Sequence, residues 1–249
     1  MKIAGFLPES YQDHPDGLSS VIFTSGCNFY CPACHARQSV FPQEEYSNEE
    51  VEKLLRRIER KKKSVDKVVF CGGEPTLQED LFLICMRLKG QGFKIKLDTN
   101  GSNPGVLEEV IGAVDYLALE IKAPRELYDA ATGRKADSDG VQDRVQESIK
   151  LRRAFHGYEL RTTIWPIAVN GSIRLMTEKE AEEMAEWVAG FAGRESKWFL
   201  QSFHARGKKD MIDGRFSAEN LPEEMQKTPQ SLLEKLQKVI GKYFDCRIR

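Results

Sequence analysis

The sequence lacks a long apolar run, a strong net charge and a signal-peptide core. No stretch approaches the roughly 18 to 20 apolar residues that cross a bilayer, and the opening MKIAGFLPES has no apolar segment of the secretory kind. The 249 residues carry a net charge of −1, which provides no basic field for nucleic acid. We therefore expect a cytoplasmic protein that acts neither on nucleic acid nor at a membrane.

Cysteine is also scarce, and its placement is uneven. Three of the six cysteines, Cys27, Cys31 and Cys34, crowd into one short stretch, while the others are scattered. A secreted disulfide framework has no reason to crowd half of its cysteines in this way, so the sequence favours reduced thiols. Three thiolates in CxxxCxxC spacing suit a soft metal centre that lacks one protein ligand. Structural zinc normally uses four such ligands, whereas a four-iron cluster held by three cysteines keeps one iron open.

Strand-like and helix-like segments alternate along the rest of the chain. Such alternation requires parallel strands joined by helical crossovers, which is the α/β class. Six units are too few for the eight-stranded barrel, so we expect an open, partial (β/α)6 TIM-like barrel. Residues 1–18 are expected to form an edge or lid segment, and 19–249 a single barrel domain. The expected strands are 19–25, 67–71, 93–97, 114–121, 158–165 and 198–203. The first expected helix begins near residue 48, and the later ones cover about 79–89, 104–111, 141–155, 178–191 and 230–243.

Polar motifs follow the expected strands where each strand ends. In parallel α/β folds the carboxyl ends of the strands share one rim, where functional side chains collect. The cysteine loop is the first of these motifs, and we expect the others to gather beside it on that rim. They are Gly72, Gly73 and Glu74, then Asp98, Thr99 and Asn100, then Glu120 and Lys122, and finally Arg161.

The combination of CNFYCPAC after one strand and GGEP after the next resembles the radical S-adenosylmethionine (radical SAM) superfamily. The resemblance implies that Cys27, Cys31 and Cys34 hold a [4Fe-4S] cluster whose fourth iron binds S-adenosylmethionine. Reductive cleavage then yields methionine and a 5′-deoxyadenosyl radical. It also implies that the Gly72 to Glu74 turn contacts the amino group of S-adenosylmethionine. Glycine permits close backbone approach, and a carboxylate complements an ammonium group.

Longer matches narrow the resemblance to the activating enzymes of glycyl-radical proteins, and most closely to the anaerobic ribonucleoside-triphosphate reductase activating protein group. The matching text includes GCNFYCPACH, VVFCGGEPTLQEDL, FKIKLDTNGSNP, VDYLALEIKAP and YELRTTIWP. The implied partners are a glycyl-radical enzyme, anaerobic ribonucleotide reductase, as protein substrate, and an electron donor such as flavodoxin or ferredoxin.

This resemblance assigns roles to the residues at the strand ends. Asp98, Thr99 and Glu120 would lie beside the carboxylate of S-adenosylmethionine and help to hold a monovalent cation, with Asn100 in the same cofactor site. Lys122 would also serve the cofactor, and Arg161 would lie near the radical-generating centre.

The chain departs from the family pattern at several positions. Glu120 stands where an aspartate is usual, and Ala33 replaces the aromatic residue that holds the adenine, so Tyr30 or His35 is expected to compensate. His35 is alternatively a fourth metal ligand or a packing residue, and His204 could face the substrate. These departures keep open a radical enzyme for a small molecule or peptide, such as a 7-carboxy-7-deazaguanine synthase. A third alternative is a non-catalytic metal-binding interaction module.

Overall fold

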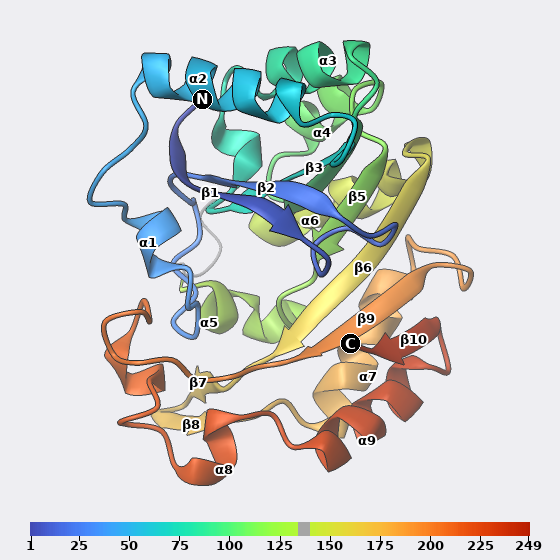
Figure 1. The fold of residues 1–249 in the computed structure, drawn as a ribbon. Helices are drawn as coiled ribbons and strands as arrows, with labels where there is room; N and C mark the ends of the chain where they lie inside the picture. Colours follow the sequence, from blue (N-terminus) through green and yellow to red (C-terminus); the bar gives the residue numbers. More distant parts are fainter. Residues whose placement is uncertain (134–139) are drawn as a thin grey trace.

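The protein is built around one open, mostly parallel sheet. The computed structural model describes residues 1–133 and 140–249 (Figure 1). Its eight-stranded sheet has the order β1-β2-β3-β4-β5-β6-β9-β10, and only β1 runs antiparallel to its neighbour. The α/β fold with parallel strands is therefore confirmed. The strands are β1 (Ile3–Ser10), β2 (Ser19–Thr24), β3 (Lys67–Gly72), β4 (Lys94–Thr99), β5 (Tyr116–Glu120), β6 (Gly157–Ile164), β9 (Lys197–Ser202) and β10 (Asp245–Ile248).

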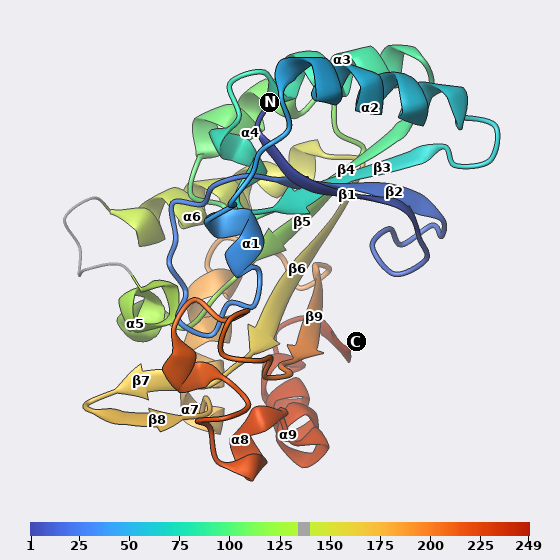
Figure 2. The same cartoon turned by 60° about the vertical axis from the view of Figure 1, so that its left-hand side comes forward.

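Helices on the outer side of the sheet connect the parallel strands (Figures 1 and 2). Each predicted strand is followed by the predicted helix, with ends shifted by a few residues. These crossover helices are α2 (Asn48–Arg60), α3 (Leu81–Gly90), α4 (Pro104–Val110), α6 (Val141–Leu151), α7 (Glu178–Ala189) and α9 (Gln230–Ile240).

Several shorter elements were not predicted, because they are too short to show a hydrophobic period. Besides strand β10, they include the hairpin β7 (Ile167–Val169) and β8 (Ser172–Arg174), which forms a separate two-stranded sheet. The other unpredicted elements are the short helices α1 (Arg37–Val40), α5 (Tyr128–Thr132) and α8 (Glu223–Gln226).

Side-chain alternation along the strands separates an apolar outer layer from a polar interior. In β4, Ile95 and Leu97 are fully buried in a hydrophobic cluster that includes residues of the outer helices. Lys96 and Asp98, which alternate with them along the strand, point instead to the inner face, where Lys96 donates a hydrogen bond to Asp98. Successive side chains of a strand point to opposite faces, so this alternation makes the inside of the barrel a charged compartment.

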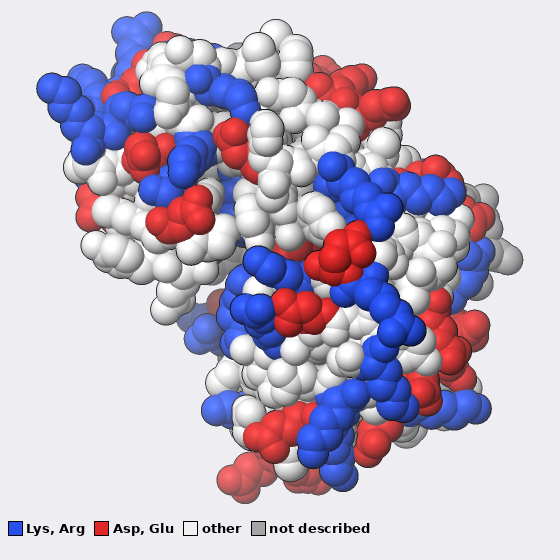
Figure 3. All heavy atoms as spheres, turned by 90° about the vertical axis from the view of Figure 1, so that its right-hand side faces the viewer, with Lys and Arg blue, Asp and Glu red and all other residues white. Residues whose placement is uncertain are grey.

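The outer surface carries both signs of charge, and Figure 3 shows basic and acidic side chains interspersed on one face. Among the described residues, no helix combines the length and the apolar character that a bilayer crossing requires.

Arg249, the residue that follows β10, forms an ion pair with Glu159 of β6. The guanidinium donates to both carboxylate oxygens of Glu159, at 2.8 and 2.9 Å, and the Tyr116 hydroxyl donates to the same carboxylate at 3.0 Å. Glu159 is completely buried, whereas the Arg249 side chain is 38% exposed. The pair therefore compensates the charge of a carboxylate that has no access to water.

We expect Arg249→Ala to lower the free energy of unfolding by about 2 kcal/mol, because it leaves the buried charge of Glu159 without its cation. The control is Arg247→Ala, which breaks an exposed pair with Asp245 two residues away and should leave the stability close to that of the wild type. Urea unfolding followed by circular dichroism measures both. Equal effects in the two variants would contradict the assigned role of Arg249.

Candidate active site

A cavity of about 360 Å³ opens at the carboxyl ends of the parallel strands. It is lined by residues from the ends of β3, β4, β5, β6 and β9 and by the loop that follows β2. The predicted site residues that line it together are Cys27, Cys31, Cys34, Gly72, Gly73, Glu74, Asp98, Thr99, Asn100, Glu120, Lys122 and Arg161.

The cysteine loop is fixed to the barrel through its backbone. Gly26 N–H donates to the Ser39 carbonyl at 2.8 Å, and Tyr30 N–H donates to the Thr132 carbonyl at 2.9 Å. Within the loop, Cys34 N–H donates to the Cys31 carbonyl at 2.9 Å. These bonds hold the thiol-bearing segment across the mouth of the barrel.

The donor set of this loop fits an iron–sulfur cluster. The three thiols are free, and two of the sulfurs accept backbone N–H groups: Cys27 Sγ from Phe29 at 3.3 Å and Cys34 Sγ from Ala36 at 3.4 Å. Hydrogen bonds to thiolate sulfur are typical of cluster sites. The fit is one of donor type and of spacing along the chain, because no three His, Cys, Asp or Glu side chains in the described part of the chain are grouped so that they could hold a metal ion.

The thiols are buried, and burial raises their pKa values. Desolvation and then the Glu74 carboxylate raise the pKa of Cys27 to about 11, and burial also raises the pKa values of Cys31 and Cys34. The Lys122 ammonium opposes the shift at all three sulfurs. The thiols are therefore protonated near neutral pH, and a bound metal centre would displace their protons.

The GGE turn packs directly on the cysteine loop. Gly73 N–H donates to the Thr24 carbonyl at 2.9 Å, and Glu74 N–H donates to the Gly26 carbonyl at 2.8 Å. A Cβ atom on Gly73 would lie 1.9 Å from the Gly26 carbonyl oxygen, and Gly72 has a φ of +105°. Glycine is thus required at position 73 because the backbone of Gly26 is so close, and at position 72 because the backbone has a positive φ.

Glu74 connects the ends of β3 and β4. Its carboxylate accepts hydrogen bonds from Thr76 N–H at 3.1 Å, Thr99 Oγ1 at 2.6 Å and Asn100 N–H at 2.8 Å. Burial raises its pKa, and these donors oppose that shift. Glu74 was predicted to contact an ammonium group, and its structural connection to Thr99 and Asn100 is an additional finding.

Asn100 continues this connection to the cysteine loop. Its Nδ2 donates to Asn28 Oδ1 at 2.9 Å and lies 3.9 Å from Cys27 Sγ. Asn28 in turn donates to Ser102 Oγ at 2.8 Å. The polar turn after β4 therefore supports the residue that follows the first cysteine.

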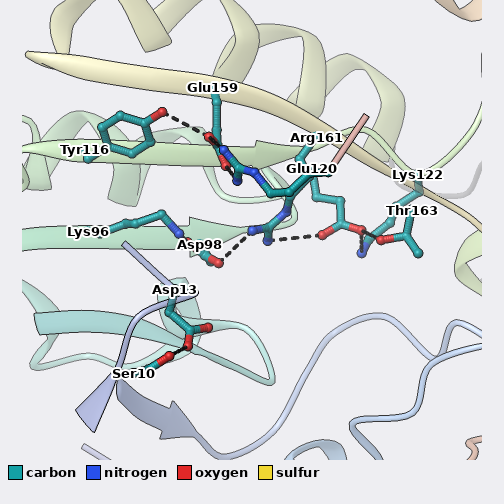
Figure 4. Close-up of polar contacts among 11 residues, drawn as sticks. Ser10, Asp13, Lys96, Asp98, Tyr116, Glu120, Lys122, Glu159, Arg161 and Thr163 are labelled. Carbon is teal, nitrogen blue, oxygen red and sulfur yellow. Dashed lines mark hydrogen bonds and ion pairs between the residues drawn. The ribbon is translucent and has the colours of Figure 1, made fainter. Parts of the chain in front are cut away.

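A chain of alternating charges crosses the inner face of β4, β6 and β5 (Figure 4). Lys96 donates to Asp98, and Arg161 Nη1 donates to Asp98 at 2.9 Å. Arg161 Nη2 lies 3.4 Å from Glu120, which is 3.1 Å from Lys122 Nζ. The network contains three cations and two anions, so its net charge is +1.

This network fixes the ionisation of its members. Burial alone would raise the pKa of Asp98, but Arg161 and Lys96 outweigh burial and hold the pKa below its usual value. Glu120 is similarly kept ionised, because Lys122 and Arg161 together outweigh the effect of burial on its pKa. The Nε atom of Arg161 is buried and has no hydrogen-bond partner among the described residues.

Sequence reasoning missed several residues that line the cavity, including an aromatic partner of Lys122. Lys122 Nζ lies 4.9 Å from the centre of the Trp165 ring, in cation–π contact. Some of these residues, such as Trp165 in YELRTTIWP, lie within the matching motif text but were given no role, whereas Gln201 lies outside it. The missed residues are Asp13, Phe29, Val40, Cys71, Thr163, Trp165, Gln201, Ser202 and Phe203.

Three residues near the expected adenine site take different positions. Tyr30 does not line the cavity; it is 48% exposed and stacks on Phe41, with ring centres 5.7 Å apart. Ala33 and His35 do line the cavity, although the His35 side chain is also exposed at the surface. His204 is exposed and forms an isolated bridge with Lys227.

Comparison with known proteins identifies the family. The profile of the radical SAM superfamily matches residues 21–166, a stretch that contains the three cysteines, the GGE turn, the β4 turn and Arg161. The chain belongs to the radical SAM superfamily. Membership implies a [4Fe-4S] cluster and S-adenosylmethionine as cofactors, in agreement with the donor set in the cavity.

Individual relatives of this radical SAM protein differ in function. It is 31% identical to a Methanocaldococcus jannaschii protein named "Putative glycyl-radical enzyme activating enzyme", over 98% of this chain and 93% of the relative. It is 28% identical to a 7-carboxy-7-deazaguanine synthase of Synechocystis, over 74% of this chain and 80% of the relative. Among solved structures, coproporphyrinogen III oxidase of Escherichia coli matches with a TM-score of 0.58 and 15% identity, over 89% of this chain and 51% of that chain.

The contact between Gly73 and Gly26 provides a direct test of the site. We expect Gly73→Ala to push the GGE turn away from the cysteine loop, to lower the free energy of unfolding by about 1 to 3 kcal/mol, and to reduce the iron bound after anaerobic reconstitution. Gly105→Ala is the control, because a Cβ there meets no atom within 4 Å. Unchanged iron content in Gly73→Ala would show that the contact does not support the site.

The pH dependence of stability tests the ion network. Asp98 has its pKa lowered from 3.8, so its contribution is complete above the unfolded pKa and is lost as the pH falls through the folded pKa. We expect Asp98→Asn to lower the free energy of unfolding by about 3 kcal/mol at neutral pH. This difference from wild type should shrink below about pH 4. Asp16→Asn, in an exposed pair with Lys94, is the control and should change stability by less than about 0.5 kcal/mol. A difference for Asp98→Asn that stays constant down to pH 2 would refute the assigned ionisation.

Proposed function

We propose that this radical SAM protein generates a glycyl radical on a partner protein, anaerobic ribonucleotide reductase or a related glycyl-radical enzyme. The observation that carries the proposal is the match to the M. jannaschii protein, which extends over 98% of this chain at 31% identity. A Clostridium pasteurianum pyruvate formate-lyase-activating enzyme, 31% identical over 47% of this chain, lends further support.

In this proposal Cys27, Cys31 and Cys34 hold the cluster, and the cavity behind them receives S-adenosylmethionine. When bound and reduced, these cofactors supply a 5′-deoxyadenosyl radical that removes a hydrogen atom from a glycine Cα. Gly72 and Gly73 line this cavity, and their lack of side chains lets the GGE turn lie directly against the cysteine loop.

The charged residues of the cavity would then orient the polar part of the ligand. Lys122 and Arg161 are two cations that line the cavity. The Nε–H group of Arg161 has no hydrogen-bond acceptor among the described residues. The carboxylates of Asp98 and Glu120 already have cationic partners in the network. Groups that are fixed before the ligand arrives cost little reorganisation during the reaction. The predicted monovalent cation beside Glu120 stays a prediction, as does the division into an edge segment, 1–18, and one barrel domain, 19–249.

The decisive experiment uses the reconstituted, dithionite-reduced protein with S-adenosylmethionine and the cognate reductase. We expect the doublet of a glycyl radical in the electron paramagnetic resonance spectrum, together with 5′-deoxyadenosine. Cys31→Ser should abolish both signals, because the variant loses one cluster ligand. An active cluster that yields 5′-deoxyadenosine but no glycyl radical would refute the proposed substrate.

A second candidate function is the modification of a small molecule, favoured by the match that covers 80% of the 7-carboxy-7-deazaguanine synthase. It predicts that a metabolite pool, and not a glycyl-radical protein, stimulates 5′-deoxyadenosine formation. The third alternative, a metal-binding module without catalysis, predicts a colourless, zinc-containing protein in place of a brown one with about four irons per chain.

A further inference from the structure

The outer side of the cysteine loop is covered by a segment from the other end of the chain, residues 204–216. Ile212 N–H donates to the Cys34 carbonyl at 3.0 Å, and Asp213 N–H donates to the Pro32 carbonyl at 3.1 Å. Arg37 Nη1 donates to the Ile212 carbonyl at 3.4 Å. Figures 1 and 2 both show this orange segment beside α1, which follows the cysteine loop. The segment therefore lies directly against the backbone of the cysteine loop.

This surface carries five exposed cations, of which Arg215 is paired with Asp213 at 2.6 Å. The other four are Arg37, Arg206, Lys208 and Lys209. We call them the basic patch. Lys208 packs along Gly214, which lies near Ile212 in the chain. Within residues 1–133 and 140–249, none of the four cations has a carboxylate within ion-pairing distance. None lines the cavity either, so the catalytic site gives no reason for their presence.

Exposed aromatic rings flank the basic patch. Tyr30 and Phe41 are 48% and 45% exposed and stack on each other with an angle of 17° between their planes. The Arg37 guanidinium lies 5.4 Å from the centre of the Phe41 ring. Aromatic residues and arginine are enriched in protein interfaces, and an exposed apolar patch bordered by charge is typical of a docking site.

We propose that the basic patch docks an acidic one-electron donor protein against the outer side of the cysteine loop. This proposal rests on the proposed function, because only a cluster that must be reduced requires a donor. One electron leaves the donor, which is oxidised, and enters the cluster, which is reduced; no bond is made or broken in this step. Complexes between redox proteins are small and transient, and complementary charge steers their association.

The position of the patch suits this role. It is attached through two backbone hydrogen bonds to Pro32 and Cys34, so a docked donor lies close to the loop without entering the cavity. Docking on this outer side leaves the inner side of the loop to S-adenosylmethionine and the substrate. An acidic donor protein docked at the cavity mouth would instead compete with S-adenosylmethionine and the substrate.

The test reverses the charge of two exposed patch residues that do not line the cavity. Lys208→Glu with Lys209→Glu is compared with Lys235→Glu with Lys238→Glu, two exposed lysines of α9 that undergo the same change of charge. The probe is a reduced flavodoxin added to the reconstituted holoenzyme. Its binding is measured by biolayer interferometry at low and high salt, and the rate of cluster reduction by stopped-flow absorbance.

We expect the patch variant to bind flavodoxin at least about tenfold more weakly at low salt, with reduction slowed to match, because steering depends on charge and is screened by salt. The α9 variant should resemble the wild type. Dithionite, a small reductant that needs no docking site, should support wild-type 5′-deoxyadenosine formation in both variants.

Two results would overturn the proposal. One is flavodoxin binding that weakens equally in the patch and α9 variants, which would show a general charge effect. The other is a patch variant that keeps normal flavodoxin binding but loses glycyl-radical formation under dithionite, which would assign the surface to the protein substrate. Flavodoxin binding and cluster reduction do not depend on the identity of the substrate, so the failure of the proposed function would leave these two readouts intact.

Discussion

The contact that the rest of the site depends on is the backbone approach of Gly73 to Gly26. It exists because β2 and β3 are parallel neighbours, which brings the loop after one strand beside the turn after the other. The approach is too close for any side chain at Gly73. Glu74, the next residue, then reaches β4 through Thr99 and Asn100. The lack of a side chain at Gly73 thus allows the ends of β2, β3 and β4 to meet beside the three thiols.

The polar interior gives the barrel a second constraint of a different kind. Buried charges are costly unless they are paired, and here Asp98, Arg161 and Glu120 lie on three adjacent strands and pair across them. Each strand must therefore keep its register for its neighbour's charge to be compensated. The charges that prepare the cavity for a polar ligand also help to specify how β4, β5 and β6 are paired.

Much of this arrangement could be predicted from the sequence, because strands that alternate with helices must be parallel and their carboxyl ends must share a rim. That reasoning correctly brought Cys27, Glu74, Asp98, Glu120 and Arg161 to one cavity. It failed where position depends on side-chain geometry or on long-range contacts. Gln201 belongs to no motif, Trp165 lies within YELRTTIWP but was given no role, and Tyr30 turns outward onto Phe41. The contact of residues 212 and 213 with the cysteine loop joins segments about 180 residues apart, and no local pattern encodes it.

The cysteine loop has two faces, and the structure gives them different surroundings. The inner face meets the cavity, where glycines and paired charges leave room for a ligand. The outer face meets residues 204–216, where Lys208 and Lys209 are exposed and unpaired among the described residues. A radical enzyme must admit electrons while keeping water and oxidants away from its reactive intermediate. Separating the two routes onto opposite faces of one loop satisfies both requirements, because a donor on the outer face has no need to open the cavity.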